Sequence, residues 1–181
     1  MPETLKIDRS HSVIGFSAKH FMVTTVRGQF LDFDGTVEVE GTDHRTLKAQ
    51  AVIKTASVTT NTQQRDDHLR SADFFDAEKY PEMTFVSSGV DKTGDDTYIV
   101  KGDLTIKDVT RPIELEATVE GSFNDPYGNE RIGVSLRGEI NREDWGLTYN
   151  QVLEAGAVMV SKKIKLEVDA AVLRPIAVPA Q

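Results

Sequence analysis

The sequence of 181 residues contains no cysteine. This absence excludes disulfide bonds, thiolate nucleophiles and zinc sites with sulfur ligands. Basic residues are also scarce, because 21 lysines and arginines stand against 29 aspartates and glutamates, and the formal net charge is −8. Nucleic acid and anionic lipid surfaces both attract lysine and arginine. The charge balance therefore argues against a nucleic-acid partner and against electrostatic docking on anionic membranes.

Long apolar runs are missing as well. No stretch approaches the ~20 apolar residues that a membrane-spanning helix requires. The first residues, Met1-Pro2-Glu3-Thr4, carry neither the basic region nor the apolar run of a secretory signal peptide. From these absences we expect a cytoplasmic protein without a membrane span. The chain has no internal repeat and no linker-like segment, so we expect one domain over residues 1–181, with a loose tail from about 175 to 181.

What the sequence does contain is alternation of apolar and polar residues, which predicts β-strands. Ile14, Phe16, Ala18 and His20 share one face of the first long predicted strand. Asp34-Gly35 has the composition of a hairpin turn. About eight such strands, each with one apolar face, predict a single enclosed interior. Long strands joined by short hairpins favour an up-and-down barrel, whose interior has room for side chains or one slim ligand.

Residues 62–70 interrupt this pattern with a predicted short helix. Asn61 or Thr62 can cap it, and Asp66 and Arg70 form an acid–base pair four residues apart. The adjacent Phe74 and Phe75 are too apolar for a solvated loop. We interpret residues 65–75 as a lid over a hollow interior.

Several short motifs occur in an order that resembles the YceI-like, polyisoprenoid-binding family. They are D-R-S-H-S at 8–12, F-S-A-K-H at 16–20, V-R-G-Q-F at 26–30, F-D-G at 33–35, S-V-T-T-N at 57–61, R-D-D-H-L at 65–69, D-F-F-D at 73–76, Y-P-E-M-T-F at 80–85, G-D-L-T-I-K-D-V-T-R-P at 102–112 and N-R-E-D-W-G at 141–146. The resemblance extends from Asp8 to about Val172.

The resemblance implies an all-β fold, an eight-stranded antiparallel lipocalin-like extended barrel with one short lid helix. It also implies one long apolar ligand: an isoprenoid such as a quinone tail or polyprenyl lipid, or a fatty acyl amide. No metal, nucleotide or covalent cofactor is implied. The chain departs from the family at two points. Many members carry a secretory signal, and members often have Gly-Asp before the final strand, where this chain has Ser161-Lys162.

The candidate ligand-binding residues are those that the alternation turns inward or that the lid carries: Phe16, Ala18, His20, Phe30, Arg65, His68, Leu69, Phe74, Phe75, Met83, Phe85, Leu104, Ile106, Val134, Leu136, Trp145 and Lys162. Large apolar rows by themselves are typical of a packed core. The family resemblance favours a tunnel instead. Small residues at inward positions also favour a bore: Ala18, Gly28, Ala49, Ala51, Gly102 and Gly138.

Three polar features have alternative interpretations. His20 is either a satisfied interior histidine or a ligand contact. The lid helix either ties down the barrel mouth or contacts a polar head group. Alternation from Val158 to Val172 places Lys162 among inward residues, where its ammonium could meet a carboxylate, phosphate or quinone oxygen, unless a bulge turns it outward.

The sequence offers little for catalysis. Asp8, Ser10 and His11 are too close along a predicted strand for their side chains to converge as a nucleophilic relay. Asp66 and Asp67 point apart on a helix, so they establish neither acid–base chemistry nor a metal site. We therefore expect no catalytic residue, no metal and no cofactor.

The resulting hypothesis is a non-catalytic carrier that sequesters an isoprenoid or a similar long-chain amphiphile. The alternatives are an enzyme that acts on a lipid head group through His20 or His68, and a filled barrel that serves as a protein-interaction module. Edge strands favour pairing of two chains, so a homodimer is among the expectations. Transport, storage and stress tolerance stay open as biological roles.

Overall fold

The computed structural model describes residues 1–151 and 158–177. Within that part of the chain, strands dominate and the α-helix is a single short segment. The elements are β1 (Glu3–Ile7), η1 (Arg9–His11), β2 (Val13–His20), β3 (Thr24–Phe30), β4 (Phe33–Glu40), β5 (Asp43–Lys54), η2 (Thr55–Ser57), β6 (Val58–Thr59), α1 (Gln63–Arg70), β7 (Glu82–Lys92), β8 (Thr97–Ile106), β9 (Val109–Asn124), β10 (Asn129–Asn141), η3 (Arg142–Trp145) and β11 (Lys163–Pro175).

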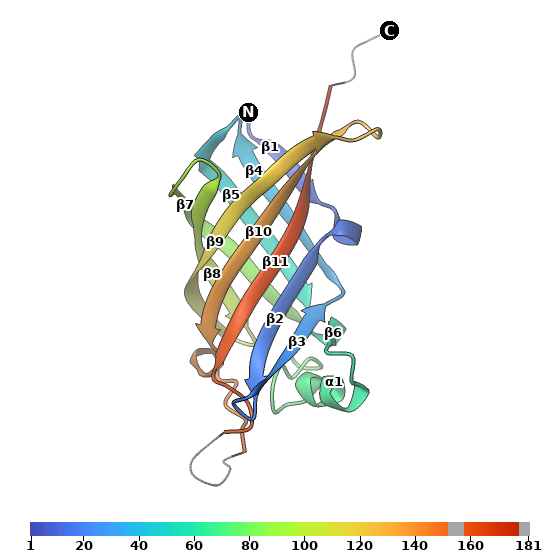
Figure 1. Ribbon diagram of the computed structural model, residues 1–181, viewed down its shortest axis with the longest axis vertical. Helices are drawn as coiled ribbons and strands as arrows, with labels where there is room; N and C mark the ends of the chain where they lie inside the picture. Colours follow the sequence, from blue (N-terminus) through green and yellow to red (C-terminus); the bar gives the residue numbers. More distant parts are fainter. Residues whose placement is uncertain (152–157, 178–181) are drawn as a thin grey trace.

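The strands close into an elongated barrel, with α1 at one end and the N-terminus at the other (Figure 1). Strands β4, β5, β7, β8, β9, β10 and β11 pair antiparallel in that order. Strand β1 pairs with both β4 and β11, and so completes a ring of eight described strands. The predicted eight-stranded antiparallel barrel with one short helix is confirmed.

The strand that pairs with β11 on one side changes along the length of the barrel. Near the N-terminal end, β1 pairs with β11 at Val172 and Leu173. Nearer α1, β2 takes its place and pairs with β11 from Lys165 to Asp169. Strands β3 and β6 extend the sheet from β2. The 3₁₀ turn η1 joins β1 to β2. It therefore marks the point along β11 at which the pairing partner changes from β1 to β2.

Part of the buried apolar core lies toward the α1 end. Phe30, Phe74 and Trp145 are buried there, with exposed fractions of 4%, 6% and 3%. The indole Nε1 of Trp145 donates a hydrogen bond of 2.9 Å to the carbonyl oxygen of Leu104. Burying each such side chain contributes about 1.5–3 kcal/mol. This packing holds the lid segment and η3 against the barrel.

The predicted turn at Asp34-Gly35 is wrong. Both residues lie inside β4. The chain only bends at Leu31 and Asp32, because β3 and β4 run in the same direction, antiparallel to β2 and β1. Gly35 is required by close packing, because a Cβ there would lie 2.5 Å from Ile7 Cδ1 and 2.9 Å from a backbone oxygen. Glycine is thus needed at this position because neighbouring strands pack closely against it. From sequence alone, an Asp-Gly pair of this kind cannot be distinguished from a turn.

The last strand differs from its predicted extent. It begins at Lys163, and Val160 makes only an isolated bridge with His20. The alternation predicted from Val158 therefore does not apply before Lys163. Pro175, which was expected in the loose tail, pairs with Asn129. The rest of the predicted tail, residues 178–181, lies outside the described residues.

The predicted helix is confirmed over Gln63–Arg70, with Thr62 at its N-cap. The predicted pair of Asp66 and Arg70 is wrong. Asp66 is buried and accepts hydrogen bonds from the N–H and hydroxyl of Thr60, at 2.7 and 2.6 Å. Arg70 pairs instead with Asp67 at 2.9 Å. Asp66 faces the end of β6, and this tertiary contact outcompetes the local helical pair.

Candidate ligand-binding cavity

A cavity of about 1190 Å³ lies inside the barrel. Leu5 and Val39 line it toward the N-terminal end, and Phe74 and Phe75 line it at the α1 end. Apolar side chains form most of the wall between them. The interior is therefore hollow over most of the barrel's length.

Aromatic rings lie flat against the wall over glycines. A Cβ on Gly28 would lie 2.4 Å from Cζ of Phe16, and a Cβ on Gly102 would lie 2.4 Å from Cζ of Phe85. Covering a strand glycine with a neighbouring aromatic ring is a known stabilising arrangement in sheets. The rings occupy space that a side chain on the glycine would take, so less of each ring projects across the bore.

The small residues consequently divide into two groups. Ala18, Ala49 and Ala51 line the cavity directly. Gly28, Gly102 and Gly138 are covered, Gly138 by a side-chain methyl of Leu115 that would lie 2.7 Å from an added Cβ. All six small residues therefore face inward as predicted, but the three glycines are separated from the cavity by the side chains that cover them.

Most of the predicted site residues line the cavity. They are Phe16, Ala18, His20, Phe30, Arg65, His68, Leu69, Phe74, Phe75, Met83, Phe85, Leu104, Ile106, Val134 and Leu136. They come from β2, β3, α1, the segment after α1, β7, β8 and β10. Their contact with a ligand stays a prediction.

Trp145 and Lys162 do not line the cavity. Trp145 packs behind Leu104, to whose carbonyl it donates. Lys162 lies on the outside, with 57% of its side chain exposed and its Nζ 3.5 Å from Oε2 of Glu143. It precedes the first residue of β11, so the strand alternation that turned it inward does not reach it. The predicted contact of Lys162 with a head group is wrong.

The α1 end of the cavity is basic. Arg65 and Arg142 line it there, together with His20 and His68, and Lys19 lies at the mouth with an exposed side chain whose Nζ donates to the Thr25 hydroxyl. In the part of the chain that the structure describes, no carboxylate forms an ion pair with Lys19, Arg65 or Arg142. The acidic residues that line the cavity lie elsewhere along it. This end thus favours a negatively charged or oxygen-rich group.

Arg142 is a buried cation that the sequence analysis did not select. Its guanidinium donates to the carbonyl oxygens of Ser161, Leu147 and Val160, at 2.9, 2.6 and 3.3 Å. Burial lowers the pKa of this arginine from its ordinary value. The guanidinium carbon also lies 5.9 Å from the ring centre of Phe74. Its place in the N-R-E-D-W-G motif was visible, but its backbone partners depend on the tertiary fold.

Arg65 connects the lid helix to the barrel. Its Nε donates to the hydroxyl of Thr60 at 2.6 Å, and Nη2 donates to the Thr60 carbonyl at 2.9 Å. Burial by itself raises the pKa of Asp66, but hydrogen bonds from the Thr60 hydroxyl and N–H outweigh it, and the pKa is lowered. The helix is therefore tied down at the barrel mouth. Contact of Arg65 with a head group stays a prediction.

The two candidate histidines have different surroundings. His20 lines the cavity, and its ring centre lies 4.0 Å from that of Phe21. His68 also lines the cavity, and its Nε2 lies 2.8 Å from Oδ2 of Asp73. The rings of Phe74 and Tyr149 pack edge-on against His68, at 5.1 and 4.7 Å. His68 is thus held in place by the lid itself.

The opposite end of the cavity is acidic. Asp96, Glu120 and Glu130 line it with one arginine, Arg174. Arg174 forms ion pairs with Glu130 and Glu3, both at 3.1 Å. The sequence analysis missed these residues, because only the strand register brings β1, β9, β10, β11 and the β7–β8 loop to one rim.

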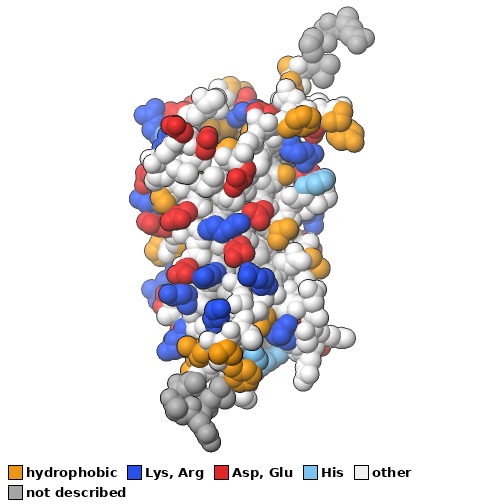
Figure 2. All heavy atoms as spheres, viewed as in Figure 1, with side chains coloured by type: hydrophobic (Ala, Val, Ile, Leu, Met, Phe, Trp, Pro, Cys, Tyr) orange, Lys and Arg blue, Asp and Glu red, His pale blue; other side chains and the backbone are white. Residues whose placement is uncertain are grey.

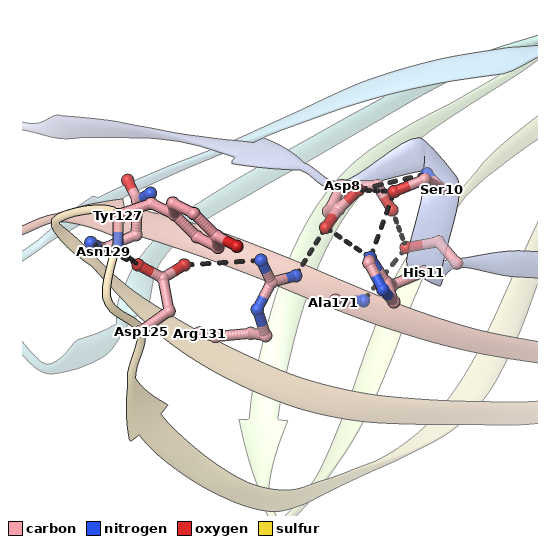
Figure 3. Close-up of polar contacts among 9 residues, drawn as sticks. Asp8, Ser10, His11, Asp125, Tyr127, Asn129, Arg131 and Ala171 are labelled. Carbon is pink, nitrogen blue, oxygen red and sulfur yellow. Dashed lines mark hydrogen bonds and ion pairs between the residues drawn. The ribbon is translucent and has the colours of Figure 1, made fainter.

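Asp8, Ser10 and His11 converge on the outer wall of the barrel (Figure 3). The expectation that they cannot converge is wrong, because residues 9–11 form a 3₁₀ turn and not a strand. However, Asp8 Oδ2 and Ser10 Oγ both contact the same nitrogen of His11, Nδ1, at 2.8 and 3.0 Å. A nucleophilic relay needs the two ring nitrogens to serve different partners. The cluster is therefore a structural joint.

Two further searches of residues 1–151 and 158–177 give negative results. No three histidine, aspartate or glutamate side chains come together as a set of metal ligands. None of the helices found there has the length and apolar character needed to cross a membrane.

Fold and site together define a lipocalin-like barrel around a long apolar cavity with a basic and an acidic end. The chain belongs to the YceI family, because residues 5–172 match the YceI-like domain. A UPF0312 protein of Staphylococcus aureus (strain MSSA476) is 40% identical over 164 residues, which cover 90% of this chain and 93% of the relative.

Solved structures agree with this fold. The Campylobacter jejuni YCEI protein superposes with a TM-score of 0.75 at 33% identity, covering 86% of this chain and 89% of that one. Burkholderia cenocepacia BcnA gives a TM-score of 0.80 at 23% identity, covering 91% and 98%. A polyisoprenoid binding domain from Saccharophagus degradans gives 0.67 at 18% identity, covering 94% and 98%.

Proposed function

We propose that this protein is a non-catalytic carrier that encloses the apolar tail of an isoprenoid or a similar long-chain amphiphile. The observation that carries the proposal is the apolar cavity of about 1190 Å³ along the barrel. Burial contributes ~0.8 kcal/mol per CH2, so a five-carbon isoprene unit gains on the order of 3–4 kcal/mol. Family membership and the likeness to a polyisoprenoid binding domain support the same class of ligand.

The charges at the two ends support one orientation of the ligand. Arg65 and Arg142 line the α1 end, whereas Glu120 and Glu130 line the other. An anionic or carbonyl-rich head group is attracted to the first end and repelled from the second. We therefore expect the head group near α1 and the apolar tail directed toward the acidic rim.

The test is organic extraction of the purified protein with mass spectrometry of the extract, beside native mass spectrometry of the intact complex. A long-chain isoprenoid or acyl compound at about one per chain is the expected result. A native mass equal to the bare chain, with an empty extract after incubation with mixed lipids, would overturn the carrier proposal.

A second measurement separates carriage from catalysis. The extracted compound is incubated with the protein and with His20→Gln and His68→Gln variants, and then analysed again. The carrier proposal predicts the same unchanged compound from all three samples. A product formed by the parent and lost in either variant would instead identify an enzyme that acts on the head group.

A further inference from the structure

The hairpin between β2 and β3 exposes three large apolar side chains. Phe21, Met22 and Val23, together called the apolar tip, have exposed fractions of 46%, 59% and 77%. Phe21 and Met22 both adopt left-handed backbone conformations, with φ of 51° and 63°. The Val23 N–H closes the turn on the His20 carbonyl at 3.2 Å. Turns of this kind favour Asn-Gly, because in the left-handed region the Cβ of most other residues lies too close to the following carbonyl oxygen.

The strained turn is held by its neighbour in space. The backbone of Lys19 exchanges hydrogen bonds with Ser161, at 2.9 Å to the hydroxyl and 3.0 Å from the Ser161 N–H. The Phe21 N–H donates to the Met159 carbonyl at 2.9 Å. The rest of the fold thus stabilises a turn that is unfavourable both in conformation and in exposure. Strain of this sort is retained at sites with a function.

Basic side chains surround the tip on the outer wall. Figure 2 shows lysine and arginine over the lower half of this face and hydrophobic side chains at its lower end. The exposed basic residues of β2, β3 and the start of β11 are Lys19, Arg27, Lys162, Lys163 and Lys165. Three of them make only long ion pairs, of 3.5–3.8 Å, with Glu143, Glu139 and Glu167. Five basic side chains thus stand against these three glutamates, so this part of the wall keeps an excess of positive charge.

A second exposed apolar tip lies at the other end of the barrel. Phe123 and Tyr127 of the β9–β10 hairpin have exposed fractions of 69% and 83%. Their neighbours include Asp125 and Glu120, and the cavity rim on that side is acidic. Only the tip of residues 21–23 therefore combines apolar exposure with basic surroundings, among the described hairpins.

We propose that the apolar tip inserts into the surface of an anionic phospholipid bilayer, with the basic wall against the lipid head groups. Apolar residues flanked by lysine and arginine are typical of proteins that bind at this interface. His20, which lines the basic end of the cavity, directly precedes the tip, so docking brings that end to the membrane. The proposal rests on the carrier function, since a membrane is where a long-chain amphiphile is loaded or delivered.

The net charge of −8 does not oppose this docking. Exposed charges are screened beyond about 8–10 Å at physiological salt. Strand β10, with 13 residues, spans on the order of 40 Å, so the acidic rim lies several screening lengths from the tip. The membrane therefore senses the local basic surface.

The test is co-sedimentation of the full chain with vesicles of equal parts phosphatidylglycerol and phosphatidylcholine, and with vesicles of phosphatidylcholine alone. We expect stronger binding to the anionic vesicles, which weakens as salt is raised. Phe21→Asn/Met22→Gly installs the favoured turn residues, so the fold is kept while binding falls at least about tenfold. Phe123→Ser removes an equally exposed ring from the acidic end and should bind like the parent.

Equal binding by the tip variant, or an equal loss in Phe123→Ser, would overturn the proposal. So would a parent dimer in sedimentation velocity that dissociates in the tip variant, because the tip would then join two copies. Ligand content of the same samples separates the two proposals. If the parent retains ligand but does not bind vesicles, the docking proposal is overturned and the carrier proposal stands. If the parent binds vesicles but contains no ligand, docking is supported and the carrier proposal is overturned.

Discussion

Asp8 stabilises the joint at which β2 succeeds β1 beside β11. Its carboxylate accepts from the side chain of Arg131, from the N–H and hydroxyl of Ser10, and contacts Nδ1 of His11. Asp125 holds Arg131 from the other side, at 3.3 Å. Only 14% of the Asp8 side chain is exposed, so these bonds are partly shielded from water.

The joint predicts a pH dependence of stability. The Arg131 hydrogen bond, and then those of Ser10, hold the pKa of Asp8 well below its ordinary 3.8. Because the pKa of Asp8 is lower in the folded protein than in the unfolded chain, its charged carboxylate stabilises the fold at pH values above the pKa of the unfolded chain. This contribution is lost as the pH falls below about 3.8. Asp8→Asn should therefore cost about 1.5–3 kcal/mol at pH 7.

The measurement is urea unfolding of parent and variant between pH 7 and pH 2. The difference between them should shrink steadily below the ordinary pKa of aspartate. A difference that stays constant over the whole range would show that the carboxylate's charge is not what stabilises the joint.

At the scale of the element, one buried hydroxyl joins two side chains of the lid helix to the end of β6. Thr60, which is 5% exposed, donates from its hydroxyl to Asp66 and accepts there from Arg65, both at 2.6 Å. Helices of eight residues are marginal alone. The attachment of α1 therefore depends on this contact, on the hydrogen bonds that Arg70 donates to the carbonyls of Ala56 and Val58, at 2.8 and 3.2 Å, and on the aromatic packing that follows the helix.

Thr60→Val keeps the shape of the side chain and removes the hydroxyl. We expect a loss of about 1–3 kcal/mol, because buried Asp66 loses a donor. Hydrogen–deuterium exchange should rise in α1 while the barrel strands stay protected, and ligand exchange should become faster. Asp67→Asn is the matched control, since the pair of Asp67 and Arg70 is exposed and contributes ~0–1 kcal/mol. Uniform exchange over the whole barrel would contradict a local role.

At the scale of the whole molecule, ligand and fold are coupled by mass action. A ligand that binds only the folded barrel adds about 2.7 kcal/mol of stability at a hundredfold excess over Kd. Protein stripped of ligand by refolding should therefore melt at a lower temperature in calorimetry, and adding back the extract should restore it. Ala51→Phe is expected to narrow the bore, since Ala51 lines it. The melting temperature of this variant should therefore not rise when the extract is added. An equal response in that variant would place the ligand outside the cavity.

The sequence predicted the barrel better than its details. Alternation in β2 and the helix at Gln63–Arg70 were confirmed, because local side-chain periodicity determines them. Asp34-Gly35 and Lys162 were misplaced. In both cases strand boundaries depend on which segments pair, and composition alone does not contain that information. The cytoplasmic location and the homodimer stay predictions.

The amino-acid sequence by itself determined the strands and the apolar lining, since these follow from residue types in a repeating local pattern, and the order of its short motifs indicated the family. The tertiary structure decided what the charges do. Acidic and basic residues are mixed along the chain, but strand register sorts them to opposite ends of the cavity. It likewise buried Arg142 among carbonyls and exposed Phe21 at a strained turn. Such placement depends on contacts between distant segments, which no local pattern specifies.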